Sequence, residues 1–172
     1  MIIIDPVDLK EITAAAESSY PDEACGLLVG RWATVQYCTI RQVVTSPNLA
    51  TDKRNSFEID WALRLDLQRR LRSGEDHVVG LYHSHPDQSA QPSTRDLSRA
   101  WEPDLVWLIT SVLDGEAVLT AAHKIEVMGG RRIFREIPLH TSDWASYGDQ
   151  TAMPVPGLEA PVGESQDEGG VA

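Results

Sequence analysis

The sequence predicts an α/β fold in which a single mixed β-sheet is flanked by about three helices. Short apolar segments rich in β-branched residues alternate with amphipathic stretches that carry helix-capping residues, which is the pattern of one layered domain. The chain has 172 residues, of which 42% are hydrophobic and 24% are charged. It is therefore long enough to bury one core and leaves little room for a second domain.

The predicted helices are recognised by the residues at their ends. Asp5 is an N-cap for a first helix over residues 6–19, which opens with a proline. Asp60 caps a second helix over residues 61–72, with leucines along one face. A short third helix begins at Ser93, whose hydroxyl group is suited to capping.

The predicted strands are apolar or alternating segments between turn residues. The turn at Asp114-Gly115 is the strongest hairpin signal in the chain. The strands expected from these patterns cover residues 2–4, 26–30, 34–45, 78–82, 104–113, 116–123 and 131–137.

The end of the chain differs in composition from the rest. All 15 basic residues lie in residues 1–137, whereas residues 138–172 hold six acidic residues, four prolines and no lysine or arginine. Such a segment buries too little apolar surface to offset the entropy of ordering it. We therefore expect a folded domain over residues 1–137 and a largely disordered acidic tail over residues 138–172.

The charge of the chain argues against two classes of binding partner. The formal net charge is −11, which disfavours partners that are nucleic acids or anionic membranes, since both are bound through basic surfaces. No apolar run is long enough to span a membrane, and the N-terminus lacks the pattern of a signal peptide. With only two cysteines, Cys25 and Cys38, a reducing cytoplasmic location is expected.

The chemically informative stretch follows the predicted strand 78–82. Histidines at positions i and i+2 of a strand point to the same face, so His83 and His85 can meet one metal ion. After Pro86, a short loop can return the carboxylate of Asp96, in the first turn of the third helix, to both histidines. Two nitrogens and one oxygen suit Zn²⁺ and leave one coordination position open, as in catalytic zinc sites.

The pattern His83-Ser84-His85-Pro86, then Ser93 and Asp96, resembles the JAMM (MPN+) metalloprotease motif His-x-His-Pro-x6-Ser-x-x-Asp. Residues 21–30 also resemble the Glu-containing segment that this family has near the end of its first helix. The resemblance covers about residues 1–137 and implies the MPN/JAMM fold, a cytidine deaminase-like sandwich.

The resemblance also implies a role for each residue of the motif. It implies a zinc peptidase in which His83, His85 and Asp96 hold one Zn²⁺. Glu23 would be the general acid/base, and Ser93 would stabilise the oxyanion. The placement of Glu23 rests on the resemblance alone, because about sixty residues separate it from His83.

The family contains ubiquitin-type isopeptidases and relatives that act on bacterial ubiquitin-like sulfur carriers, both of which cut after a C-terminal Gly-Gly. The short body of this chain is similar to the short prokaryotic members. The resemblance therefore implies a ubiquitin-like or sulfur-carrier protein as the substrate. Three alternatives stay open at this point: a catalytically silent scaffold that only binds partners, a zinc hydrolase of another amide bond, and a cysteine peptidase that uses Cys25.

Overall fold

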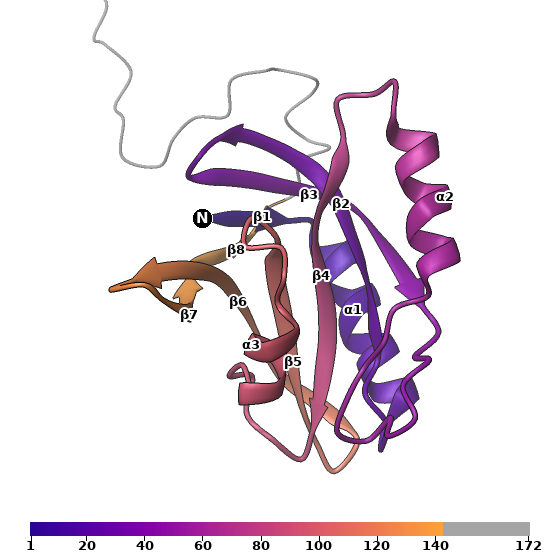
Figure 1. Cartoon of the computed structure of the whole chain (residues 1–172). Helices are drawn as coiled ribbons and strands as arrows, with labels where there is room; N and C mark the ends of the chain where they lie inside the picture. The colour runs from indigo at the N-terminus through magenta and orange to yellow at the C-terminus, as the bar shows by residue number, and fades with distance from the viewer. Residues whose placement is uncertain (143–172) are drawn as a thin grey trace, which may run out of the picture.

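The computed structural model describes residues 1–142. They form one mixed sheet that curls into a half-barrel with three helices packed on it, which confirms the predicted fold class (Figure 1). The strand order is β7-β6-β5-β4-β2-β3-β1-β8, so β4 and β2 lie at the centre. The strands are β1 (Ile2–Ile4), β2 (Cys25–Thr34), β3 (Tyr37–Ser46), β4 (His77–Pro86), β5 (Val106–Leu113), β6 (Glu116–Met128), β7 (Arg131–Ile137) and β8 (Leu139–Thr141).

The three helices are α1 (Pro6–Ser19), α2 (Trp61–Leu71) and α3 (Thr94–Arg99). The first two begin at the predicted caps: the Asp5 carboxylate accepts a hydrogen bond from the Val7 N–H, and the Asp60 carboxylate accepts one from the Ala62 N–H, each at 2.8 Å. Each cap satisfies a backbone donor that the first helical turn leaves without a partner.

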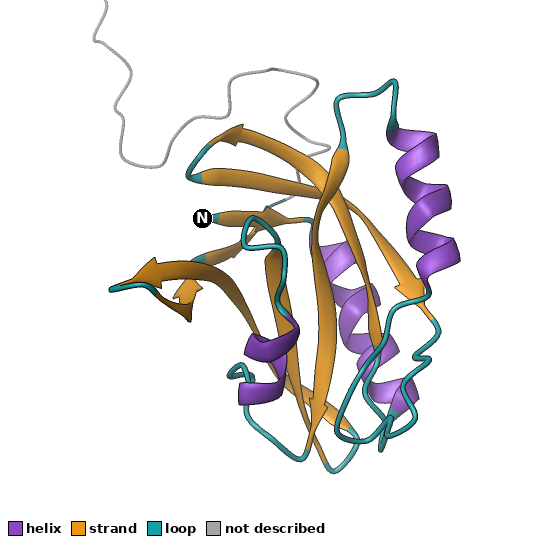
Figure 2. Ribbon diagram, viewed as in Figure 1, coloured by secondary structure: helices purple, strands orange, loops and turns teal. Residues whose placement is uncertain are grey.

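The helices cover both faces of the sheet (Figure 2). On one face, α1 packs Ile12 and Ala16 into the largest core cluster, which includes Tyr82 of β4. On the other face, Leu67 of α2 packs against Leu27 of β2. Because successive residues of a strand point to opposite faces, the residues next to Tyr82 in β4 belong to the face that carries α2.

The position of β4 determines where α3 lies. β4 pairs with β2 in antiparallel orientation and with β5 in parallel orientation. A parallel pair needs a crossover between its strands, and here residues 87–105 provide it and contain α3. The residues that follow the end of β4 are thereby returned over the sheet, with α3 in front of β5 in Figure 1.

Two strands differ from the sequence-based expectations. The single strand expected over residues 34–45 is wrong, because Val35 and Gln36 form a tight turn between β2 and β3. The Thr34 hydroxyl closes this turn by accepting a hydrogen bond from the Gln36 N–H at 3.2 Å, and no glycine, proline or asparagine marks it. The second difference is β8, an unpredicted strand that pairs with β1 in parallel orientation. The rest of the predicted tail lies outside the described residues.

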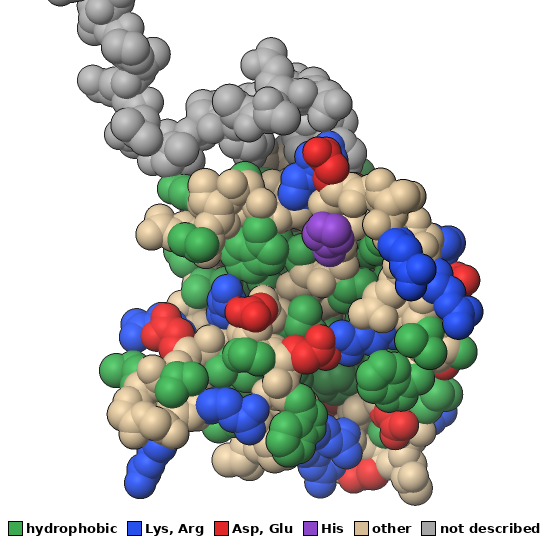
Figure 3. All heavy atoms as spheres, turned by 45° about the horizontal axis from the view of Figure 1, so that its top comes forward, with side chains coloured by type: hydrophobic (Ala, Val, Ile, Leu, Met, Phe, Trp, Pro, Cys, Tyr) green, Lys and Arg blue, Asp and Glu red, His purple; other side chains and the backbone are tan. Residues whose placement is uncertain are grey.

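The surface of the molecule carries charges of both signs. Acidic and basic side chains are interspersed on the face shown in Figure 3. Within residues 1–142, no helix has the length and apolar character needed to cross a membrane.

Candidate metal centre

Two histidines lie side by side at the end of the central strand. His83 and His85 project from the same face of β4 because they are two residues apart. Both are buried, with 0% and 4% of their surface exposed, and their Nε2 atoms are 3.0 Å apart. β4 ends at Pro86, where the chain turns into the crossover.

Asp96 reaches the same point from α3. Ser93 is the N-cap of this helix, and its Oγ accepts a hydrogen bond from the Asp96 N–H at 3.1 Å. In return, the Asp96 Oδ2 accepts hydrogen bonds from the Ser93 N–H at 2.7 Å and from the Ser93 Oγ at 2.6 Å. This capping box holds the carboxylate with its oxygens 3.4 Å from the Nε2 atoms of His83 and His85.

The three side chains fit a zinc ion in both chemistry and spacing. One ligand atom from each lies within 4.8 Å of the others, and the closest separations are 3.0 Å and 3.4 Å. Ligands about 2.1 Å from a tetrahedral zinc ion lie about 3.4 Å from one another. The group can therefore hold a metal ion with little rearrangement, and it leaves one of four positions open for another ligand.

The two imidazole rings are oriented in different ways. The Nδ1 of His85 donates a hydrogen bond to the Ser89 carbonyl at 2.9 Å, which leaves the lone pair of His85 on Nε2, facing the site. The Nδ1 of His83 is buried without a hydrogen-bond partner among residues 1–142. Instead, the Phe57 ring stacks on His83 with centroids 4.3 Å apart, and Trp107 meets the same ring edge-on at 5.8 Å.

Glu23 is brought to this site by the pairing of β2 with β4. It lies two residues before β2, whose first residue, Cys25, is paired with His83. The Ala24 N–H donates to the Ser84 Oγ at 2.8 Å, and the Ser84 N–H donates to the Ala24 carbonyl at 3.0 Å. The register therefore holds Glu23 beside the end of β4, where it is only 5% exposed.

The Glu23 carboxyl group is poorly solvated. Its Oε2 is buried and has no hydrogen-bond partner in the described part of the chain. Burial raises the pKa of Glu23 to about 8, while the nearby charge of His85 lowers it and that of Asp96 raises it. A carboxyl group that titrates near neutral pH beside a set of metal ligands is suited to accepting and releasing a proton.

Burial and hydrogen bonding set the protonation states of the ligand group. Burial alone would raise the pKa of Asp96, but its hydrogen bonds with His83 and His85 outweigh burial and hold the pKa well below its ordinary value. Complete burial lowers the pKa of His83. Asp96 is therefore an ionised carboxylate and His83 a neutral imidazole, the forms that bind metal ions. Burial lowers the pKa of His85, but its hydrogen bonds to Asp96 and to the Ser89 carbonyl raise it overall, so a metal ion that binds there displaces a proton from His85.

The connection between β3 and α2, residues 47–60, is a part of the site that the sequence analysis missed. The Asn48 Nδ2 donates to the Glu23 carbonyl at 2.9 Å and to the Ser56 carbonyl at 3.0 Å. The Glu23 N–H donates to the Lys53 carbonyl at 2.7 Å. The backbone of Glu23 is therefore fixed by this connection.

The same connection is also fixed to α3. Arg99 donates to the Ser56 Oγ at 2.6 Å and to the Phe57 carbonyl at 2.9 Å, and Arg95 donates to the Asn55 carbonyl at 2.7 Å. One segment thus links Glu23, the Phe57 ring on His83 and the helix that carries Asp96. No local signal marks these polar residues, because their partners are distant in the sequence.

The two cysteines are free and buried. Burial raises the pKa of both Cys25 and Cys38 to about 12, so both are thiols at neutral pH. A cysteine nucleophile acts as the thiolate. The position of Cys25 near the site therefore gives little support to a cysteine-peptidase mechanism.

Comparison with known proteins points to a single family. The model described as prokaryotic homologs of the JAB domain matches residues 7–124. The chain is 33% identical to the desampylase of Haloferax volcanii over 103 residues, which are 60% of this chain and 72% of that protein. It is 28% identical to the CysO-cysteine peptidase of Mycobacterium tuberculosis over 117 residues, 66% of this chain and 75% of that protein.

A solved structure agrees with these relatives. The solution structure of a protein from Desulfitobacterium hafniense superposes with a TM-score of 0.69 at 26% identity, and the match covers 83% of this chain and 93% of that one. The family match spans more than half of the chain and includes Glu23, Ser93 and the three grouped side chains. This protein is therefore a member of the prokaryotic branch of the JAB, or JAMM, family.

Proposed function

We propose that this protein is a zinc-dependent peptidase or isopeptidase that hydrolyses the bond after a C-terminal Gly-Gly of a ubiquitin-like or sulfur-carrier protein. The observation that carries the proposal is the buried group of His83, His85 and Asp96 with the carboxyl of Glu23 beside it. The family membership and the names of the two relatives, a desampylase and a CysO-cysteine peptidase, support hydrolysis of this kind.

In this proposal the zinc ion is held by the Nε2 atoms of His83 and His85 and by the carboxylate of Asp96. When bound, zinc supplies a Lewis acid that polarises the scissile carbonyl and makes water a stronger nucleophile at neutral pH. The Glu23 carboxylate accepts the proton of the attacking water and later delivers it to the leaving nitrogen. Burial raises the pKa of Glu23 to about 8 in the metal-free protein, and a bound dication would lower it toward neutral pH, where a carboxyl group can both accept and release a proton.

Ser93 has two roles in this proposal. Its Oγ holds the Asp96 carboxylate through the capping box. When the hydroxyl turns toward the substrate, it donates a hydrogen bond to the carbonyl oxygen as negative charge develops there. Ser93→Ala should therefore lower kcat more than it raises KM.

The proposed substrate follows from the chemistry of the scissile region. Residues without side chains allow the substrate backbone to approach a buried metal closely, which favours a protein that ends in Gly-Gly. The enzyme would act in the cytoplasm, where Cys25 and Cys38 remain reduced; both are free and buried.

The test combines metal analysis with substrate cleavage. We expect one zinc ion per chain and release of C-terminal extensions from carrier proteins that end in Gly-Gly, read by mass spectrometry. Glu23→Gln should keep the zinc and lose cleavage by at least about a hundredfold, since general acid/base groups typically contribute that much. Glu11→Gln, on the exposed side of α1, is the matched control.

Each alternative predicts a different result. A binding scaffold would show no cleavage with any carrier, even when loaded with zinc. A hydrolase of another amide bond would cleave small amides while leaving the carrier extensions intact. Full activity of Glu23→Gln would exclude the assigned role of Glu23.

A further inference from the structure

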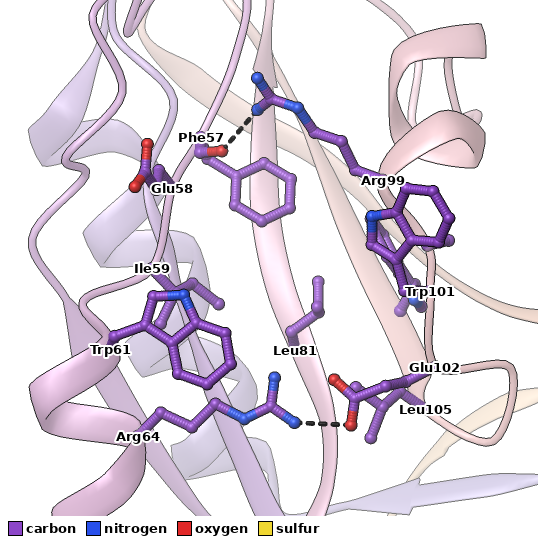
Figure 4. Close-up of a pocket in the computed structure, with 12 residues that line it drawn as sticks. Phe57, Glu58, Ile59, Trp61, Arg64, Leu81, Arg99, Trp101, Glu102 and Leu105 are labelled. Carbon is purple, nitrogen blue, oxygen red and sulfur yellow. Dashed lines mark hydrogen bonds and ion pairs between the residues drawn. The ribbon is translucent and has the colours of Figure 1, made fainter.

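A cavity of about 550 Å³ opens on the same face of the sheet as the metal centre. Figure 4 shows how its sides are built: Trp61 and Arg64 come from the start of α2, and Trp101 and Glu102 come from the segment after α3. Leu81 of β4 lies between them, at the floor. We call this cavity the tryptophan groove.

The two tryptophans that form its sides are unusually exposed. Trp61 is 64% exposed and Trp101 is 77% exposed. Large apolar side chains that are exposed on the two sides of a cavity are typical of binding surfaces. An arginine lies close to each ring: the Arg64 guanidinium, which also lines the groove, lies 5.4 Å from the Trp61 ring, and that of Arg132 lies 5.6 Å from the Trp101 ring. These cation–π contacts favour one orientation of each ring, which reduces the entropic cost of binding.

The tryptophan groove is adjacent to the metal centre. Phe57, which stacks on His83, and Trp107, which meets the edge of the same ring, both line the groove. A polypeptide whose scissile bond lies at the metal ligands can therefore extend directly into it. The Phe57 and Trp107 ring centroids lie 4.3 Å and 5.8 Å from that of His83, distances that an extended chain covers in about two residues at about 3.3 Å per residue.

The two arginines that line the groove already have partners, while the carboxylate of Glu58 also lines it and is exposed. Arg64 binds Glu102 at 2.6 Å and bridges the two sides at one end. At the other end, Arg99 donates to the Phe57 carbonyl and to the Ser56 Oγ. Since both arginines form these contacts, the apolar surface between them is the larger part of what the groove presents to a ligand.

We propose that the tryptophan groove selects the substrate by a large apolar side chain that lies between Trp61 and Trp101, within a few residues of the Gly-Gly. The occupant is the extended segment of the carrier protein that precedes the scissile bond. This inference rests on the proposed function for the identity of the substrate. The groove itself is assigned from its walls and from the contacts of Phe57 and Trp107 with His83.

Binding can be measured without catalysis. Zinc-loaded Glu23→Gln protein is titrated with fluorescein-labelled serine-rich peptides that end in Gly-Gly and carry one leucine, which is moved through the third to sixth positions from the end. Fluorescence anisotropy should show that one position binds at least about tenfold more tightly than the all-serine peptide, because a leucine side chain leaves water.

Variants of the walls connect this preference to the groove. Trp61→Ala and Trp101→Ala, each added to Glu23→Gln, should remove the preference for leucine, while Trp61→Phe should retain part of it. Val35→Ala and Leu119→Ala remove exposed apolar side chains elsewhere and should leave the preference unchanged. In the active protein, the two alanine variants should raise KM for a carrier substrate about tenfold at nearly constant kcat.

The outcomes separate this inference from the proposed function. If leucine peptides bind selectively through Trp61 and Trp101 but no carrier is cleaved, the groove stands and the enzymatic proposal fails. If carriers are cleaved and both alanine variants keep the wild-type KM and the leucine preference, the groove proposal is overturned. It is also overturned if Trp61→Ala and Trp101→Ala instead convert a dimer to a monomer in sedimentation, since a second copy would then be the occupant.

Discussion

Glu23 illustrates how one buried carboxyl group links protein stability to pH. Its pKa is raised by burial from an ordinary value of 4.5 to about 8. Between these two pH values the unfolded chain ionises Glu23 while the folded metal-free protein keeps it protonated. The contribution of Glu23 to stability is thus complete below pH 4.5 and is lost as the pH rises to about 8.

Glu23→Gln should remove this dependence. In the presence of a chelator, the free energy of unfolding of the wild type should fall relative to the variant by on the order of 3 kcal/mol between pH 4.5 and pH 8. Urea denaturation at a series of pH values measures the difference. Parallel pH profiles for the two proteins would contradict the burial of an uncompensated carboxyl group.

Cys25 provides a second prediction for a single residue. Its thiol is buried and has a pKa of about 12, so folded protein should react with iodoacetamide at least about a hundredfold more slowly than unfolded protein. Cys25→Ala should keep the wild-type kcat. Rapid labelling of Cys25 in the folded protein, together with loss of turnover in the variant, would restore the thiol mechanism.

Among the structural elements, the β3–α2 connection does the most to hold the site together. It fixes the backbone of Glu23 through Asn48 and is itself fixed to α3 through Arg99. Because Phe57 stacks on His83 from this connection, its anchoring determines how firmly one metal ligand is oriented. Packing here takes the place of the hydrogen bond that usually orients a ligand histidine.

Arg99→Met should therefore weaken metal binding without removing a ligand. We expect the affinity for zinc to fall about tenfold, as for the loss of other groups that support metal ligands. Competition with a fluorescent chelator gives this number, and Arg69→Met on the exposed side of α2 is the control. An unchanged zinc affinity would mean that Phe57 is dispensable for holding His83. In that case Phe57→Leu would also leave the zinc affinity unchanged.

At the scale of the whole molecule, the proposed metal ligands join two parts of the fold. His83 and His85 belong to the central strand, whereas Asp96 belongs to the crossover helix. An ion that binds only the folded arrangement stabilises the entire domain by mass action. The stability of the domain should therefore depend on the concentration of zinc.

Zinc at a hundred times its dissociation constant should stabilise the protein by about 2.7 kcal/mol, which raises Tm by about 5–10 °C for a chain of this size. Calorimetry with and without chelator measures the shift. Asp96→Asn should largely remove it, and magnesium should not replace zinc because it prefers octahedral oxygen sites. A Tm that is the same with and without zinc would argue against a metal centre at this position.

Much of the fold follows from local patterns. The caps at Asp5 and Asp60 mark the start of α1 and α2. Such a cap can be predicted locally because its carboxylate accepts a hydrogen bond from a backbone N–H only two residues later in the chain. The hairpin at Asp114-Gly115 appears with positive φ at both residues, as this dipeptide predicts. The turn at Val35-Gln36 escaped prediction because alternation continues through it and a threonine hydroxyl closes it.

For the site, the sequence by itself determined the ligand group. His83, His85 and Asp96 lie within fourteen residues, so the alternation of a strand, a short loop and a helix cap are enough to bring them together. Only the tertiary structure decided the position of Glu23, the anchoring of Phe57 by Arg99 and the tryptophan groove. Each of these depends on contacts between segments some forty to sixty residues apart, and such contacts arise from packing of the whole chain, which leaves no periodic signal in any one segment.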